Sequence, residues 1–372
     1  IQPIQWGTDY RQTLDETLLA EELGFHSVWI SEHHGRHSGY YPSPLVVLAS
    51  LATRTRSVLL GANVVLLPLY HPVRVAEDAA LVDVISKGRL VLGLAIGYRP
   101  EEFQLFGVPM RERASRLEEG IEIIKRLWTE DAVTHAGRHF QFKDGSIFPK
   151  PVQRPRPPIW IGGWVDQAIR RAAQIGDAWF PGPTAMWEKL AHCYGVYRDA
   201  MAATRAVPQE VPLIREVFVA ETQAEADRDG GAHLARMYQE DYVAWGHATV
   251  AGTRVSQGRF IVGDPATCIQ AIRQYREEFG ITHFITRMHA PGMDPILAGG
   301  ISLAFLMGVA ASYGAGYVGM GLAVRGNTRV ANAALSSFKG ALEIAFQAGT
   351  VSGMFTTGLG LLGATLIIIM FK

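Results

Sequence analysis

The sequence predicts a parallel α/β barrel over residues 1–292 and a pair of membrane-spanning helices over residues 296–372. Two observations lead to this division. Up to about Gly292, short runs rich in β-branched residues alternate with longer amphipathic segments, which is typical of repeated strand–helix units. From Pro295 onward, residues 295–324 and 344–371 contain no Asp, Glu, Lys or Arg. Each stretch exceeds the roughly 20 apolar residues that cross a bilayer.

Seven strands can be placed in the first part, and the chain begins beside a helix. We therefore expect an eight-stranded barrel whose first strand lies upstream of Ile1. A doubly wound open sheet is the alternative, but no G-x-G-x-x-G turn follows a first strand, as that fold would normally require. The predicted strands are 26–31, 58–67, 90–96, 158–161, 177–180, 213–220 and 282–287, and the predicted helices include 11–23, 73–85, 114–128, 165–175 and 265–279.

The composition excludes some classes of function. Lys and Arg total 35 and Asp and Glu total 35, so no basic excess is present to attract nucleic acid. Cys193 and Cys268 are too far apart in sequence for a metal-ligand motif or a disulfide framework. They are expected to be buried thiols in a reducing, cytoplasmic compartment.

Functional side chains of a parallel barrel lie at the C-terminal ends of its strands. In this chain those ends carry imidazoles, an amide and glycines rather than a nucleophile and its base. Free N–H groups at a helix start reached past two glycines suit a phosphate, although such an exit can also be a simple tight turn. The strand-end residues are Ser31, Glu32, His33, His34, Asn63, Val64, Ala95, Ile96, Gly97, Gly162 and Gly163, with Trp164 and Val165 leading into the next helix.

The histidines near the first predicted strand end allow more than one interpretation. His33, His34 and His37 can be merely a polar loop, and spacing alone does not decide between that and a catalytic role. A metal site is disfavoured because adjacent residues on an extended strand point apart and no set of carboxylates accompanies them. We therefore expect no bound metal.

Two further polar groups are interpreted as structural. His71 and Pro72 open a helix, where Arg74 and Asp78 are spaced for surface pairing. The region of Thr134, His135 and His139 is typical of a hairpin with exposed polar residues.

Four long runs support a more specific assignment. SEHH (31–34), LLPLYHPVRVAEDAALVDVISKGRL (66–90), GYRPEEFQLFGV (97–108) and PPIWIGGWVDQAIRRAAQIGDAW (157–179), in this order, resemble the bacterial luciferase family of flavin-dependent oxidoreductases. The resemblance extends over nearly all of residues 10–292. It implies a TIM barrel that holds a flavin at its mouth and uses it to activate oxygen.

The resemblance also assigns roles to residues. His33 matches the active-site histidine, and Asn63-Val64 matches a non-prolyl cis peptide behind the flavin ring. The segment Gly162 to Val165 matches the phosphate site, and Glu32, His34, Ala95 and Gly97 are further expected cofactor contacts. In luciferase itself, hydroxyl side chains help to bind the phosphate at this segment, and an arginine stands at the position of Ile96. Phosphate binding would then depend on backbone donors and Arg170, so a flavin or a deazaflavin is implied.

The expected enzyme is a monooxygenase. Reduced FMN, supplied by a flavin reductase, would react with O2 and oxygenate a small organic substrate. A homodimer is a further expectation. A rival function in the same fold is hydride transfer from coenzyme F420 without oxygen. The substrate itself is not encoded in any motif that we identify.

The C-terminal segment resembles a different protein. GYVGMGLAVRGNTRVANAA (316–334) and ALEIAFQAGTVSGMFTTGLGLLG (341–363) are similar to early helices of membrane-bound, ion-translocating pyrophosphatases, without that family's acidic metal-binding motifs. The tail contains the predicted spans 296–324 and 344–371. It is thus expected to anchor the chain in a membrane and to have no activity alone. Arg325, Arg329 and Lys339 make the connecting loop cationic, and cationic loops stay on the cytoplasmic side of a membrane. This topology would place the barrel outside the cell. That location conflicts with the reducing compartment that the cysteine content of the barrel indicates. The side occupied by the barrel stays open.

Overall fold

The computed structural model describes residues 1–3, 10–35, 40–204, 210–242 and 258–288. The chain divides into two units, Ile1–Pro295 and Ile296–Lys372, and all described residues belong to the first. The two predicted membrane spans therefore lie outside the described residues. Within the described residues, every helix is too short or too polar to cross a bilayer.

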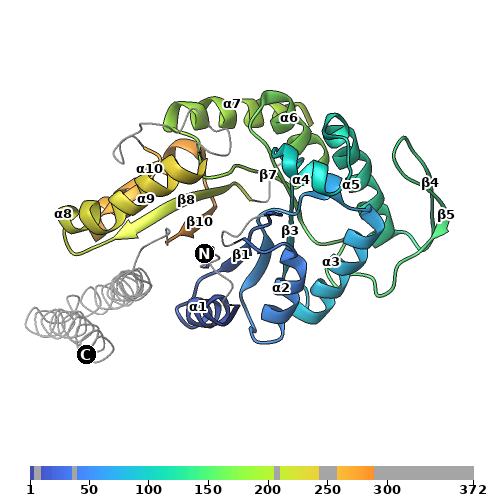
Figure 1. Cartoon of the computed structure of the whole chain (residues 1–372), viewed down its shortest axis with the longest axis horizontal. Coiled ribbons are helices and arrows are strands. Elements are labelled where there is room, and N and C mark those ends of the chain that lie inside the picture. Colours follow the sequence, from blue (N-terminus) through green and yellow to red (C-terminus); the bar gives the residue numbers. More distant parts are fainter. Residues whose placement is uncertain (4–9, 36–39, 205–209, 243–257, 289–372) are drawn as a thin grey trace, which may run out of the picture. The chain divides into compact units, whose positions relative to one another are not determined.

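Parallel strands form the centre of the first unit, with helices on the outside (Figure 1). All seven predicted strands are present. The additional strand, β9, has three residues, which is too short for a recognisable sequence pattern. One sheet has the order β1 (Ser27–Ile30), β2 (Leu59–Ala62), β3 (Leu90–Leu94), β6 (Ile159–Gly162) and β7 (Ala178–Phe180), and the other has β10 (His283–Arg287), β8 (Pro212–Val219) and β9 (Ile261–Gly263).

Ile1 and Gln2 join the two sheets. The Gln2 N–H donates to the carbonyl of Thr286 at 2.8 Å, and the Trp29 N–H donates to the carbonyl of Ile1 at 2.9 Å. Gln2 also pairs in parallel with Arg287. Gln2 therefore lies between the two sheets, where the first strand was expected, and a single bridge is too short to show strand periodicity. The strand expected upstream of Ile1 stays a prediction.

The helices follow the strands in the expected alternation. Pro residues at the first turn begin α2, α3, α4 and α10, where the missing N–H costs nothing. Helices α2 and α7 were not among the predicted helices. The sequence of α2 is apolar on every face and therefore shows no amphipathic pattern. The helices are α1 (Tyr10–Glu22), α2 (Pro44–Ala52), α3 (Pro72–Ser86), α4 (Pro100–Leu105), α5 (Arg113–Thr129), α6 (Asp166–Ile175), α7 (Trp187–Thr204), α8 (Gln223–Ala226), α9 (Ala232–Met237) and α10 (Pro265–Phe279).

The predicted helix start at His71 and the predicted pair Arg74–Asp78 are confirmed, and α10 begins with a side-chain cap as well. The Asp264 carboxylate accepts the Thr267 N–H at 2.8 Å at the start of α10. The His71 ring accepts the Val73 N–H at 3.3 Å at the start of α3, and Arg74 is paired with Asp78. Cys193 and Cys268 are buried free thiols, as expected.

Aromatic rings fill the interior of the strand layer. Trp29 stacks on Trp160 at 4.8 Å between ring centroids, and Phe180 meets Trp29 edge-on at 5.0 Å. A side chain at Gly61 would overlap the Trp29 ring. His283 donates to or accepts from Ser27 Oγ at 2.7 Å, and burial lowers the pKa of His283 to about 3, so this imidazole is neutral. The filled interior leaves ligand space only towards the strand ends.

A hairpin extends from the end of α5, as predicted. It is formed by β4 (Val133–Ala136) and β5 (Gln141–Gly145). The expectation that its histidines are exposed is wrong, because both find partners on α5. The Glu119 carboxylate accepts from His135 Nε2 at 3.1 Å and from the backbone N–H of Phe140 at 2.9 Å, and His139 Nε2 lies 2.8 Å from Ser115 Oγ.

The carboxylate of Glu21 ties the end of α1 to the chain that enters β2. It accepts backbone N–H groups from Arg56 at 2.8 Å, Ser57 at 2.6 Å and Val58 at 3.1 Å. Burial alone would raise the pKa of Glu21, but these hydrogen bonds outweigh it and lower the pKa to about 2. Because the folded pKa lies below the unfolded value of about 4.3, this carboxylate stabilises the fold above that value.

Glu21→Gln should lower the free energy of unfolding by about 1 kcal/mol at pH 7, because an amide forms weaker hydrogen bonds with the three N–H groups. The difference from the parent chain should shrink as the pH falls from about 4.3 towards 2. Urea unfolding at several pH values measures it. Glu22→Gln, one residue further along and exposed, is the matched control and should show no such pH-dependent difference.

Candidate active site

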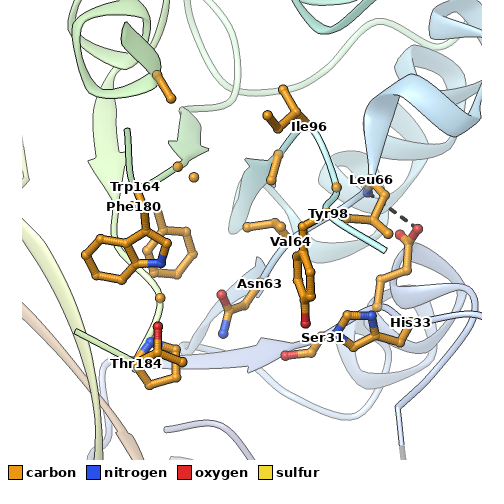
Figure 2. Close-up of a pocket in the computed structure, with 18 of the residues that line it drawn as sticks. Ser31, His33, Asn63, Val64, Leu66, Ile96, Tyr98, Trp164, Phe180 and Thr184 are labelled. Carbon is orange, nitrogen blue, oxygen red and sulfur yellow. Dashed lines mark hydrogen bonds between the residues drawn. The ribbon is translucent and has the colours of Figure 1, made fainter. Parts of the chain in front are cut away.

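A cavity of about 350 Å3 opens at the C-terminal ends of the parallel strands. Figure 2 shows Asn63 and Val64 between two groups of side chains, with Ser31, His33 and Tyr98 on one side and Trp164, Phe180 and Thr184 on the other. Nearly every residue predicted for the site lines this cavity, namely Glu32, His33, Asn63, Val64, Ala95, Gly97, Gly162, Gly163, Trp164 and Val165.

His33 is held by a buried carboxylate. Its Nδ1 lies 2.8 Å from Glu102 Oε1, and the two side chains are 13% and 1% exposed. Burial would raise the pKa of Glu102, but the hydrogen bond and charge of His33, the His34 N–H and the Arg99 guanidinium together lower it. Glu102 therefore remains ionised and accepts the Nδ1 proton, which leaves the lone pair of a neutral His33 on Nε2.

Glu102 was not singled out from the sequence. It lies on α4, beyond the strand end that we searched, and its only sequence signal is an acidic residue inside the run GYRPEEF. The fold brings α4 against the end of β1, and Arg99 Nη1 adds a second contact to Glu102 at 3.3 Å. Residues far apart in the chain thus form one charged group.

His34 is not among the residues that line the cavity, and its predicted contact with a cofactor stays a prediction. Its Nε2 lies 2.9 Å from Glu32 Oε1 and 3.0 Å from the Tyr70 hydroxyl, and its ring packs edge-on against Phe106. The reason is the extended backbone, on which successive side chains point in opposite directions. His33 and His34 therefore serve two different sites.

Glu32 forms part of the cavity wall but is almost completely buried. Its Oε1 accepts from the Tyr70 hydroxyl at 2.9 Å and from the Leu66 N–H at 3.4 Å, the dashed line in Figure 2. Burial raises the pKa of Glu32, and the hydrogen bonds from His34 and Tyr70 offset only part of this effect. The predicted role of Glu32 in contacting a cofactor stays a prediction.

The Asn63-Val64 segment is closely packed from behind. The peptide bond between these residues is cis, as predicted. A side chain at Gly93 would overlap the Ala62 carbonyl oxygen and crowd Val64 Cγ1 at 3.1 Å. Because Gly93 has no side chain, β3 can pack this closely behind the Asn63-Val64 segment.

The opposite part of the cavity offers donors for an anion. Gly162 and Gly163 leave β6, and α6 begins after the N-cap residue Val165 with its first N–H groups unsatisfied within the helix. Arg113, the first residue of α5, lines the same cavity, and no hydrogen bond or ion pair joins its guanidinium to the described part of the chain.

Arg170 was expected to assist here, but it is exposed on α6 and lies outside the cavity lining. Two other arginines line the cavity: Arg113, and Arg287, which is paired with Glu216. A signal for Arg113 exists in the sequence, because a basic residue at a helix start opposes the helix dipole and is unfavourable unless an anion compensates it.

Comparisons with known proteins agree with this geometry. Residues 2–283 match the family described as luciferase-like monooxygenase, and residues 273–372 match inorganic H+ pyrophosphatase. The oxygenase component of the flavin-dependent trigonelline monooxygenase of Acinetobacter baylyi is 30% identical over 240 residues, which are 63% of this chain and 66% of that protein.

Two further similarities extend over more of each partner. An F420-dependent glucose-6-phosphate dehydrogenase of Microbacterium testaceum is 31% identical over 309 residues, 76% of this chain and 88% of that protein. The crystal structure of monooxygenase RslO1 from Streptomyces bottropensis superimposes with a TM-score of 0.75 at 28% identity, covering 84% of this chain and 98% of that chain. By contrast, the chain spans only 66% of the length of the trigonelline monooxygenase component, and 48% and 55% of two further curated relatives.

Gly93→Ala should destabilise the fold by about 3 kcal/mol, because the new methyl group would overlap a backbone oxygen that cannot rotate away. Thermal or urea unfolding of the full chain measures the loss. Gly195→Ala on α7 is the matched control: nothing lies near its added methyl group, and alanine in a helix should instead stabilise by about 1 kcal/mol. Equal effects of the two substitutions would contradict the packing described behind Asn63-Val64.

Proposed function

Because the chain belongs to the luciferase-like monooxygenase family, we propose that its cavity binds reduced FMN and oxygenates a small organic substrate with O2. The observation that carries this proposal is the pairing of His33 with the buried, ionised Glu102 in the same cavity as Arg113 and the start of α6. A separate flavin reductase would supply the reduced cofactor.

The residues present fit a flavin phosphate. The N–H groups of the first two residues of α6 have no acceptor within the helix, and the guanidinium of Arg113 has none among the described residues. Arg113 lines the same cavity as Gly162 to Val165. An anion there would satisfy the helix start and offset the basic residue at the start of α5. Bound reduced FMN would supply the electrons for oxygen activation.

His33 would exchange a proton at Nε2 during the reaction. Glu102 accepts from Nδ1, which fixes the tautomer and stabilises the imidazole when it becomes protonated. Tyr40 and Tyr98 pack edge-on against the His33 ring at 4.7 and 6.0 Å and restrict its rotation. Trp164, Phe180 and Leu66 give the cavity apolar walls that exclude water from the reacting groups.

A second candidate function is hydride transfer with coenzyme F420. The similarity to the glucose-6-phosphate dehydrogenase of Microbacterium testaceum favours it. The backbone donors at α6 would bind the phosphate group of either cofactor. In that case, the His33 and Glu102 pair would exchange a proton with an alcohol substrate.

We also propose roles for the parts that lie outside the described residues. Residues 296–324 and 344–371 would anchor the chain in a membrane as a fragment of the pyrophosphatase type, inactive alone, and the barrel would lie in the cytoplasm. Homodimer formation would cover exposed apolar side chains on α2 and α3, including Val46 at 69% and Leu81 at 47%.

Oxygen consumption by the full chain distinguishes the two cofactors. With FMN, a flavin reductase and NADH, the chain should add substrate-dependent oxygen uptake above that of the reductase alone. With F420 and candidate alcohols under anaerobic conditions, no change in F420 absorbance is expected. The reverse result would replace the first function by the second, and a negative result in both assays would contradict the site.

His33→Ala should lower kcat by about 100-fold or more, because proton transfer by a positioned imidazole contributes roughly 100- to 10,000-fold. The Kd for FMN should change by less than about threefold, since the phosphate and ring walls remain. Stopped-flow kinetics and a flavin fluorescence titration measure the two quantities. His135→Ala, which removes a carboxylate-paired histidine of the hairpin that lies outside the cavity lining, is the control. An unchanged kcat in His33→Ala would remove the role assigned to His33.

A further inference from the structure

A short chain of hydrogen bonds crosses the floor of the cavity and is not used by the proposed function. Asn63 Nδ2 donates to Gln2 Oε1 at 3.2 Å, and Gln2 Nε2 donates to Ser31 Oγ at 2.8 Å. All three side chains line the cavity, and Gln2 and Ser31 are buried, at 8% and 6% exposed.

Gln2 is fixed by its backbone as well as by its side chain. Its N–H bonds to Thr286 on β10, and the preceding residue, Ile1, accepts from Trp29 on β1. The side chain therefore projects from a segment held on both sides by strands. A glutamine held in this way presents its two amide atoms in fixed directions, with the oxygen towards Asn63 and the nitrogen towards Ser31.

This arrangement determines which end of the Asn63 amide faces the ligand. Its nitrogen is directed to Gln2, so its carbonyl oxygen Oδ1 is left towards the cavity, where no described residue donates to it. Figure 2 shows the Asn63 amide extending into the space between Trp164 and Tyr98. The cavity thus contains a hydrogen-bond acceptor between apolar walls, where an acceptor without a donor is unfavourable.

We propose that Gln2 is a positioning residue that turns the Asn63 carbonyl into the cavity, where it accepts an N–H group of the bound flavin ring. The inference rests on the proposed function, because it requires a flavin. Oxidised FMN has one ring N–H, at N3, and reduced FMN has another at N5. Oxidised FMN methylated at N3 has none.

The three forms of FMN test the acceptor. Titrations of the full chain, anaerobic for reduced FMN, should show that Asn63→Leu weakens binding selectively, by about fivefold for one hydrogen bond. If N3–H is the donor, oxidised FMN loses affinity and its N3-methyl derivative does not. If N5–H is the donor, reduced FMN loses more than oxidised FMN. An equal loss for all three forms, or no loss for any, overturns the proposal.

A double-mutant cycle tests the role of Gln2. Gln2→Leu should cause most of the loss seen in Asn63→Leu, with the same dependence on ring N–H groups, and the double variant should lose no more than Asn63→Leu alone. Additive losses would mean that Gln2 does not act through Asn63. Gln2→Met, which keeps the length and flexibility of the side chain, repeats the measurement if Gln2→Leu does not fold.

Gln153→Leu provides the matched control. Gln153 also donates two hydrogen bonds through Nε2, to Asp83 and to the Leu90 carbonyl, but it lies outside the cavity lining. Its substitution should leave all three affinities unchanged, and a change would indicate a general effect of lost stability and overturn the assignment. If the unsubstituted chain binds none of the three forms, the proposed function fails together with this inference. If it binds them without coupling between Gln2 and Asn63, only the inference fails.

Discussion

The stack of Trp29, Trp160 and Phe180 inside the strand layer is the constraint on which the site depends. These rings occupy the interior, and Gly61 has no side chain because the Trp29 ring lies against its backbone. A ligand can then enter only beyond the strand ends, where the loops that follow the strands supply its contacts. The neutral, deeply buried His283 belongs to this filled interior and not to the site above it.

The extended backbone at the end of β1 separates two adjacent histidines into two environments. His33 faces the cavity and is paired with Glu102, whereas His34 faces the interior and is paired with Glu32 and Tyr70. The two carboxylates respond in opposite directions, since the pKa of Glu32 is raised and that of Glu102 is lowered. At Glu32 the effect of burial dominates. At Glu102 burial is outweighed by the hydrogen bond and charge of His33, the His34 N–H and the charge of Arg99.

The sequence predicted the strands, the cavity residues on them and the cis peptide, because these features depend on local pattern or on long runs shared with a family. It did not predict Glu102 or Arg113, since each enters the site from a helix start or a helix interior whose placement depends on the packing of distant segments. It did not show that His34 turns away from the cavity, and it wrongly assigned His135 and His139 to solvent. The strand end and the hairpin that carry these histidines were predicted correctly. The direction of each histidine side chain depends on a hydrogen-bond partner that the sequence pattern did not reveal.

Helix α5 carries both the arginine at its first residue, which lines the cavity, and the residues that fasten the hairpin. Ser115 and Glu119 bind His139 and His135, and Arg116 lies 4.9 Å from the centroid of the Phe140 ring. The hairpin therefore fastens the same end of α5 that carries Arg113. A change on the hairpin surface that loosened these contacts would shift the arginine as well, so this surface can influence the affinity of the anion site without touching the ligand.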